Sequence, residues 1–161
     1  MPYGICGALK RNNGAALIYV IVLLAVIVIL STSVMMLFSS NLRQAKHQER
    51  RVEAYYLAYS GIEMAVSALL QKDPQDRTLL DEFKWDPTVN PNIADDLADK
   101  PVLTDTLDLG NGVVTITVRA VNNGNRREVR IDTVGALNDS GTSNELTLIF
   151  DAENPLIQRW E

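Results

Sequence analysis

The sequence predicts an α+β fold in which one long N-terminal helix packs on a small C-terminal antiparallel sheet. Three patterns support this prediction: a long uncharged apolar run, apolar residues spaced by three and four behind it, and segments of alternating polarity toward the C-terminus. The 161 residues suit one domain. Because Cys6 is the only cysteine, no intramolecular disulfide can form, so burial of apolar side chains must stabilise the fold.

Residues 1–14 form a short leader that carries Lys10 and Arg11 and ends in Gly14. Basic residues also follow the apolar run, so charge counting alone leaves the orientation in a membrane open. A secretory signal peptide would place a cleavage site of small residues behind the run. Here the small polar residues 31–33 lead back into apolar residues, so we do not expect a conventional cut at that point.

The next segment, residues 15–38, contains no charged residue, and from Ala15 to Leu30 every residue is apolar or Tyr19. As a helix with a rise of about 1.5 Å per residue, it would span roughly 36 Å, enough to cross a bilayer. Its surface would be apolar on all sides. Lipid or other helices must therefore surround it, because the rest of the chain is too small to enclose it.

Residues 39–72 are predicted to continue the same helix as an amphipathic half. No proline occurs between Pro2 and Pro74, and good helix formers dominate the segment. Large apolar residues recur at spacings of three and four and should form the face that packs on the sheet. This predicted helix–sheet core consists of Val52, Tyr55, Tyr59, Ile62, Val66 and Leu69.

The rest of the chain is predicted to form a connection, a sheet and a tail. Residues 73–112 read as an acidic connecting loop region with 10 Asp or Glu against 3 Lys or Arg. Residues 113–152 contain three runs that alternate between apolar and polar residues and are separated by Asn- and Gly-containing turns. They predict a three-stranded antiparallel sheet, which needs the amphipathic helix as its cover. Residues 153–161 form a tail.

The composition argues against several classes of function. The formal net charge of −5 argues against nucleic acid as the primary ligand. We expect no catalytic, cofactor-binding or metal-binding residues, and no cofactor. The only histidine, His47, lies among basic residues on a predicted solvated helix face. Calcium is a weaker alternative for the acidic loop, which lacks the EF-hand spacing; its candidate ligands are Asp95, Asp96, Asp99, Asp105 and Asp108.

The layout of basic leader, apolar helix, amphipathic continuation and C-terminal sheet resembles a type IV prepilin. The stretch Lys-Arg-Asn-Asn-Gly-Ala from Lys10 to Ala15 precedes the apolar helix as in that family. The segment Ala-Tyr-Tyr-Leu-Ala-Tyr-Ser-Gly-Ile-Glu, residues 54–63, is similar to the Ala-Glu-Ala-Gly-(Ile/Leu)-Glu stretch of minor pilins of the PilX type. A weaker similarity covers residues 131–135.

The resemblance implies that a prepilin peptidase cuts between Gly14 and Ala15 on the cytoplasmic side and that the new N-terminus is methylated. It implies a single-pass protein of the bacterial inner membrane with its C-terminal domain outside, which reaches the pilus and cell surface after assembly. Its partners would be other pilin subunits, the prepilin peptidase, the inner-membrane pilus assembly machinery and membrane lipid. The assembly helix would pack against other subunits through Leu17, Tyr19, Leu23, Leu24, Ile27 and Leu30.

Two positions depart from the family pattern. Tyr19 is the fifth residue of the expected mature chain, where most pilins have a Glu that is thought to pair with a neighbour's N-terminal amine. In related secretion systems the subunit without this Glu sits at the tip, so the resemblance implies a minor, priming or tip role. Tyr59 stands where minor pilins commonly have Glu.

Two other functions compete with this interpretation. A bitopic membrane anchor or accessory protein of a pilus or secretion apparatus would share the apolar helix but would have no need of cleavage after Gly14. A membrane-bound enzyme would require a catalytic group that the sequence does not display. The sequence does not indicate whether a pilus of this kind serves adhesion, motility, secretion or DNA uptake.

Overall fold

The computed structural model describes residues 13–161 of the chain, with side chains from Leu17 onward. Residues 1–12 of the predicted leader therefore lie outside the described residues. The chain divides into two compact units, of which the first ends at Lys46 and the second comprises His47–Glu161. Each unit is described by itself below.

The first long element is the helix α1, Asn13–Leu70. Its bounds confirm the prediction of a single helix over residues 15–71 to within two residues at each end. The helix ends before Pro74, as expected from a residue that lacks a backbone N–H and clashes with the preceding turn. The part in the first unit is long and apolar enough to be a membrane span or a signal sequence.

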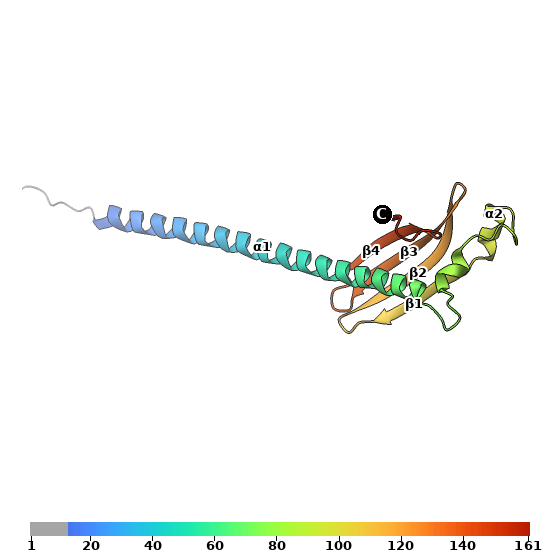
Figure 1. Ribbon diagram of the computed structural model, residues 1–161. Coiled ribbons are helices and arrows are strands. Elements are labelled where there is room, and N and C mark those ends of the chain that lie inside the picture. The colour runs from blue at the N-terminus through green and yellow to red at the C-terminus, as the bar shows by residue number, and fades with distance from the viewer. Residues whose placement is uncertain (1–12) are drawn as a thin grey trace, which may run out of the picture. The chain divides into compact units, whose positions relative to one another are not determined.

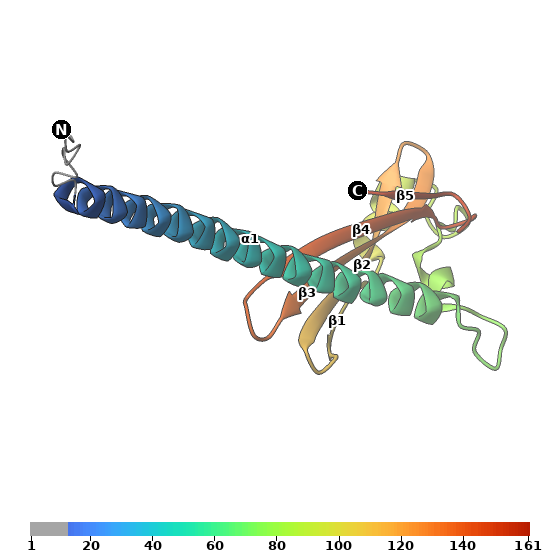
Figure 2. The same ribbon diagram turned by 90° about the vertical axis from the view of Figure 1, so that its left-hand side faces the viewer.

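The second unit contains a five-stranded antiparallel sheet in the order β1-β2-β3-β4-β5. Its three long strands are β2, Gly112–Asn123, β3, Arg126–Leu137, and β4, Ser143–Asp151. The final turns of α1, drawn in green, lie across one face of this sheet (Figures 1 and 2). The predicted α+β class, with a helix packed on an antiparallel sheet, is thus confirmed.

The three predicted strands correspond to β2, β3 and β4. In β2 every second residue from Val114 to Ala120 is buried, which is the alternation predicted for a strand covered on one face. The β2–β3 hairpin turns through Gly124, whose φ of 59° lies in the left-handed region that favours glycine. This short turn fixes the register in which Val118 pairs with Ile131.

The sheet has two strands more than the sequence predicted. The strand β1, Val102–Asp108, lies in the segment predicted to be a connecting loop, and β5, Gln158–Trp160, lies in the predicted tail. Neither has a readable pattern: β1 places Asp105 on the same face as its two leucines, and β5 is only three residues long. Both pair antiparallel at the edges of the sheet.

The predicted loop region also contains short helical segments that precede β1. They are η1, Leu79–Phe83, α2, Ile93–Asp96, and η2, Leu97–Asp99. Leu80 and Phe83 from η1 are 3% and 0% exposed, so this region contributes to the core instead of merely connecting two parts of it. Sequence reasoning missed this because isolated apolar residues carry no periodicity.

Candidate interaction surfaces

The apolar half of α1 is exposed along its whole described length. Every residue from Leu17 to Phe38 is exposed, including all six residues predicted for the assembly helix, from Tyr19 at 75% to Ile27 at 49%. Apolar area costs about 25 cal/mol per Å² to leave in water, so a surface of this extent must be covered by lipid or by other proteins. The exposed side chains from Leu17 to Phe38 together surround the helix.

The hydroxyl groups of Thr32 and Ser33 in this half bond to the helix itself. Thr32 Oγ1 donates to the carbonyl oxygen of Ile29 at 2.9 Å, and Ser33 Oγ donates to the same carbonyl oxygen at 2.8 Å. In lipid an unpaired hydroxyl would have no water to bond. These internal bonds therefore keep the segment compatible with an apolar environment.

The residues of the predicted cleavage site lie at the start of this helix. Gly14 and Ala15 are in the first turn of α1, which begins at Asn13. Their side chains, and the basic leader residues Lys10 and Arg11, lie outside what the structure describes.

A face of small residues joins the second half of α1 to the sheet. Ala54, Ala58, Gly61 and Ala65 are buried at spacings of four, three and four. A Cβ atom added at Gly135 of β3 would lie 2.5 Å from the backbone oxygen of Ala54 and 2.5 Å from the backbone nitrogen of Ala58. The helix backbone therefore rests directly on the strand backbone at this point.

A hydrogen bond and a second glycine are consistent with this close approach of α1 to the sheet. Thr133 of β3 is fully buried, and its Oγ1 donates to the carbonyl oxygen of Ala58 at 3.0 Å. A Cβ on Gly61 would lie 2.5 Å from a methyl carbon of Val114, so this glycine also has no room for a side chain. The small residues in the sequence that resembles minor pilins thus have a physical role in packing the helix.

The predicted helix–sheet core is partly wrong. Ile62 and Leu69 are 1% and 2% exposed, as predicted, and Val66 packs against the core while partly buried. Val52, Tyr55 and Tyr59 are 52%, 40% and 36% exposed. The prediction followed the large apolar side chains alone, whereas the buried face also includes small residues such as Ala54 and Ala58, which allow the closest backbone approach. The periodic Ala and Gly residues were the signal that would have identified this face.

The exposed tyrosines form an aromatic stack with the C-terminal strand. The Tyr59 ring stacks on Trp160 at 5.8 Å between centroids and on Tyr55 at 6.4 Å. A hydrogen bond to Glu63, together with the charge of that carboxylate, raises the pKa of the Tyr59 hydroxyl. The stack holds the short strand β5 against α1 while leaving the phenol groups in water.

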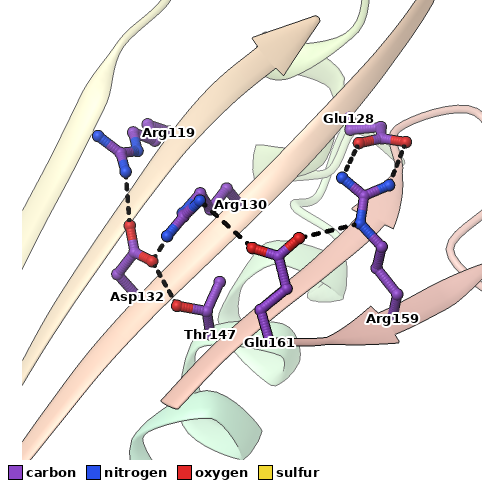
Figure 3. Close-up of polar contacts among 7 residues, drawn as sticks. All are labelled: Arg119, Glu128, Arg130, Asp132, Thr147, Arg159 and Glu161. Carbon is purple, nitrogen blue, oxygen red and sulfur yellow. Dashed lines mark hydrogen bonds and ion pairs between the residues drawn. The ribbon is translucent and has the colours of Figure 1, made fainter. Parts of the chain in front are cut away.

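The outer face of the sheet carries a chain of ion pairs that ties down the C-terminus (Figure 3). Asp132 accepts from Arg130 Nε at 2.8 Å, and its second oxygen lies 3.0 Å from Arg119. Arg159 of β5 pairs with Glu128 at 2.9 Å and with Glu161 at 3.4 Å (Figure 3). The arginines of these pairs are partly exposed and the Asp132 and Glu128 carboxylates largely buried, so the pairs position the strand more than they stabilise it.

The acidic residues considered for calcium do not gather into one site. Among residues 13–161, no group of three or more His, Cys, Asp or Glu side chains is placed to hold a metal ion. Asp96 is instead 6% exposed and pairs with the buried Arg127 at 2.7 Å and with Lys100 at 3.4 Å. The alternative of calcium binding therefore loses one of its candidate ligands to an ion pair. His47 is exposed on α1.

Comparison of the chain with protein-family models, with curated proteins and with solved structures finds no match. The pilin-like character of the chain rests on its architecture, a long helix with an apolar first half whose second half packs on an antiparallel sheet.

Proposed function

We propose that this chain is a minor pilin-like subunit that is processed by a prepilin peptidase. It takes part in initiating a filament or in forming its tip complex. The observation that carries the proposal is the division of α1 between two environments. Its first half exposes every described apolar side chain, while its second half is packed on the sheet. A helix of this kind can be held by lipid before assembly and by neighbouring helices afterwards.

The proposed role is structural and not catalytic. In the membrane, the apolar half of α1 would anchor a domain that folds on the far side. In a filament, the same surface would pack against equivalent helices, which replace lipid with protein at little cost because both are apolar. The partners are therefore other pilin-like subunits, the peptidase, inner-membrane assembly machinery and lipid.

Processing is the first step that can be tested. We expect a mature chain that begins at Ala15, because Gly14 borders the polar leader and offers a peptidase no obstructing side chain. Gly14→Arg should block maturation, whereas Gly7→Arg adds the same charge inside the leader and should be cut normally. Mass spectrometry of the N-terminus in a purified filament fraction gives the answer. Recovery of an intact Met1 terminus from filaments would overturn the proposal.

The proposed position in the filament rests on Tyr19. A phenol cannot supply the negative charge that would pair with a neighbour's buried amine, and leaving that amine unpaired is costly. Tyr19→Glu should increase incorporation along the shaft, and Tyr19→Phe should leave it unchanged. Immunogold labelling measures this directly. Dense, uniform labelling of every filament by the natural chain would identify a major subunit instead.

The competing function is a membrane anchor that never polymerises. It predicts that the chain remains in the membrane fraction with its leader intact and never appears in sheared filaments. Protein recovered only from membranes, with residues 1–14 still attached, would favour the anchor.

A further inference from the structure

The strand β1 lies at an open edge of the sheet. The Leu109 N–H donates to the Gly112 carbonyl oxygen at 2.9 Å in the β1–β2 turn. Because hydrogen-bonded and non-bonded pairs alternate along an antiparallel ladder, the N–H and C=O groups of Thr104, Thr106 and Asp108 point away from β2. Within residues 13–161, β1 pairs with β2 alone. The Thr106 N–H is bonded to the Asp105 carboxylate at 2.8 Å, and the other outward groups form a template for one more strand.

The inner face of this strand is only partly covered, with Leu107 packed against the core. In β2, the residues that face α1 are buried, but in β1 Leu103 and Asp105 are exposed although they face the same way. A groove of about 600 Å³ lies between this face and α1. It is lined mainly by apolar side chains, among them Met64, Ala68, Leu79, Leu103 and Leu107.

Asp105 places a carboxylate in this apolar groove. Its partner in the register is Ile116, a core residue, so its side chain is on the face that α1 covers elsewhere. No ion pair among the described residues involves Asp105 or Asp108, and β1 contains no basic residue. Asp105 Oδ1 accepts a hydrogen bond from the Thr106 N–H at 2.8 Å, so the groove combines apolar walls with one negative charge that has no cationic partner among the described residues.

We propose that the β1 edge binds an extended segment of a partner protein as an additional strand of the sheet. The register defines its chemistry. The residues of the added strand that face α1 would lie beside Leu103, Asp105 and Leu107, which calls for an apolar, a basic and an apolar side chain at alternate positions. The occupant is thus a segment with the pattern apolar-x-Lys/Arg-x-apolar. Backbone hydrogen bonds would supply affinity and the alternate side chains specificity.

A second copy of this chain is disfavoured as the occupant. Antiparallel pairing of two β1 edges would bring two copies of Asp105 into neighbouring positions inside an apolar groove, and like charges placed opposite each other destabilise a strand pair. An inward-facing charge at an edge is also a known protection against self-association. The same charge favours a basic partner.

The test uses the isotope-labelled full chain in detergent micelles and the peptide Ac-Thr-Val-Thr-Lys-Thr-Val-Thr-NH2. A matched peptide carries Glu in place of Lys. We expect the Lys peptide to shift the amide resonances of Thr104, Thr106 and Asp108 with a Kd below about 1 mM, and the Glu peptide to bind at least about tenfold more weakly. Failure of the Lys peptide to shift these resonances, or equal binding of both peptides, would overturn the proposal.

Variants at three positions of β1 test three contributions to binding separately: the charge in the groove, an outward backbone N–H group and the net charge of the strand. Asp105→Lys should reverse the preference between the two peptides. Thr104→Pro removes an outward N–H that has no hydrogen-bond partner among the described residues, leaves the β1–β2 ladder intact and should weaken binding at least about tenfold. Asp108→Lys makes the same charge change on the opposite face and should alter binding by less than about threefold. The resonances of β3 report whether each variant is folded.

Asp105→Lys tests the proposal even if the proline variant fails to fold. Because Asp105 is exposed, we expect the Asp105→Lys chain to fold. An Asp105→Lys chain that is folded and keeps its preference for the Lys peptide would refute the assigned groove. The experiment requires no filament, so its result is independent of the role in assembly proposed above.

Discussion

The two halves of α1 are both rich in apolar residues, but they differ in how much of that apolar surface the chain itself buries. The first half carries large aliphatic side chains on every side, and all those described from Leu17 to Phe38 are exposed. The second half turns one face toward the sheet, in which alanines and Gly61 alternate with larger residues such as Ile62 and Leu69, and leaves its tyrosines exposed. A surface that is apolar all round needs an environment that surrounds it, whereas a flat seam of small residues fits a single flat partner.

The comparison shows that hydrophobicity alone does not identify a packing face. Val52 and Tyr55 are 52% and 40% exposed although both are apolar, whereas the smaller Ala54 and Ala58 are fully buried beside Ile62 and Leu69. Close backbone approach, marked by the Thr133–Ala58 hydrogen bond, adds to the contact made by the buried side chains of Ile62 and Leu69.

The largest expected effect tests which residues face the sheet. Ile62→Asp should lower the free energy of unfolding by about 4 kcal/mol, because it buries a charge with no partner. Val52→Asp places the same charge at a position that is 52% exposed and should change it by less than about 0.5 kcal/mol. Urea unfolding of the full chain in micelles, followed by tryptophan fluorescence, measures both. Similar losses in the two variants would mean that Val52 also belongs to the packed face.

Gly135→Ala tests the close approach of the α1 backbone to β3. One added methyl group would collide with backbone atoms of α1, which cannot rotate away as a side chain can, so we expect a loss of about 3 kcal/mol. Gly124→Asn is the control, because nothing lies within 4 Å of that position and Asn tolerates a positive φ. A fully stable Gly135→Ala chain would show that the helix is not seated on β3 as described.

A charge in the first half should separate the two regions. Ile27→Arg should cost about 2.5 kcal/mol in insertion into a membrane, as expected for a charge near the centre of a span. It should leave the unfolding of the sheet unchanged, because Ile27 has no contact in the core. Membrane fractionation and urea unfolding provide the two readouts, with Ile27→Leu as control. A destabilised sheet would show that the halves are coupled.

The aromatic stack provides a smaller effect. Trp160→Ala removes the ring that stacks on Tyr59 and should cost about 1 kcal/mol, with a selective loss of amide protection in β5. Leu156→Ala removes a side chain that is 90% exposed and should have no measurable effect. Hydrogen exchange distinguishes the two. Unchanged protection of β5 in Trp160→Ala would assign its anchoring to the ion pairs of Figure 3 alone.

The smallest effect concerns pH and the segment before β1. Hydrogen bonds from Lys84 and from Thr78 lower the pKa of Asp81 from 3.8 to about 2. Since the folded chain has the lower pKa, the stabilisation is complete above the ordinary value and disappears as the pH falls toward about 2. Partial exposure of the pair limits it to below about 0.5 kcal/mol. Unfolding of Asp81→Asn should lose this acid dependence, and Glu82→Gln should retain it.

Much of the fold follows from the sequence alone, because its signals are local. The apolar run, the absence of proline and the alternation in β2 to β4 each depend on neighbouring residues, and they predicted one helix and three strands correctly. The long helix α1 and the turn at Gly124 could therefore be predicted without knowing which residues they contact in the folded chain.

Other features were decided only by the tertiary structure. The strand β1 has no period of two, and it forms because β2 offers a ladder to pair with. The face of α1 was set by how closely two backbones can approach at Gly135, a quantity that depends on residues more than seventy positions apart. The open edge of β1, with Asp105 facing the groove and no cation beside it among the described residues, also exists only once the sheet is assembled. Local sequence determines which elements form, but the distance between them determines which residues are buried and which surface is left for a partner.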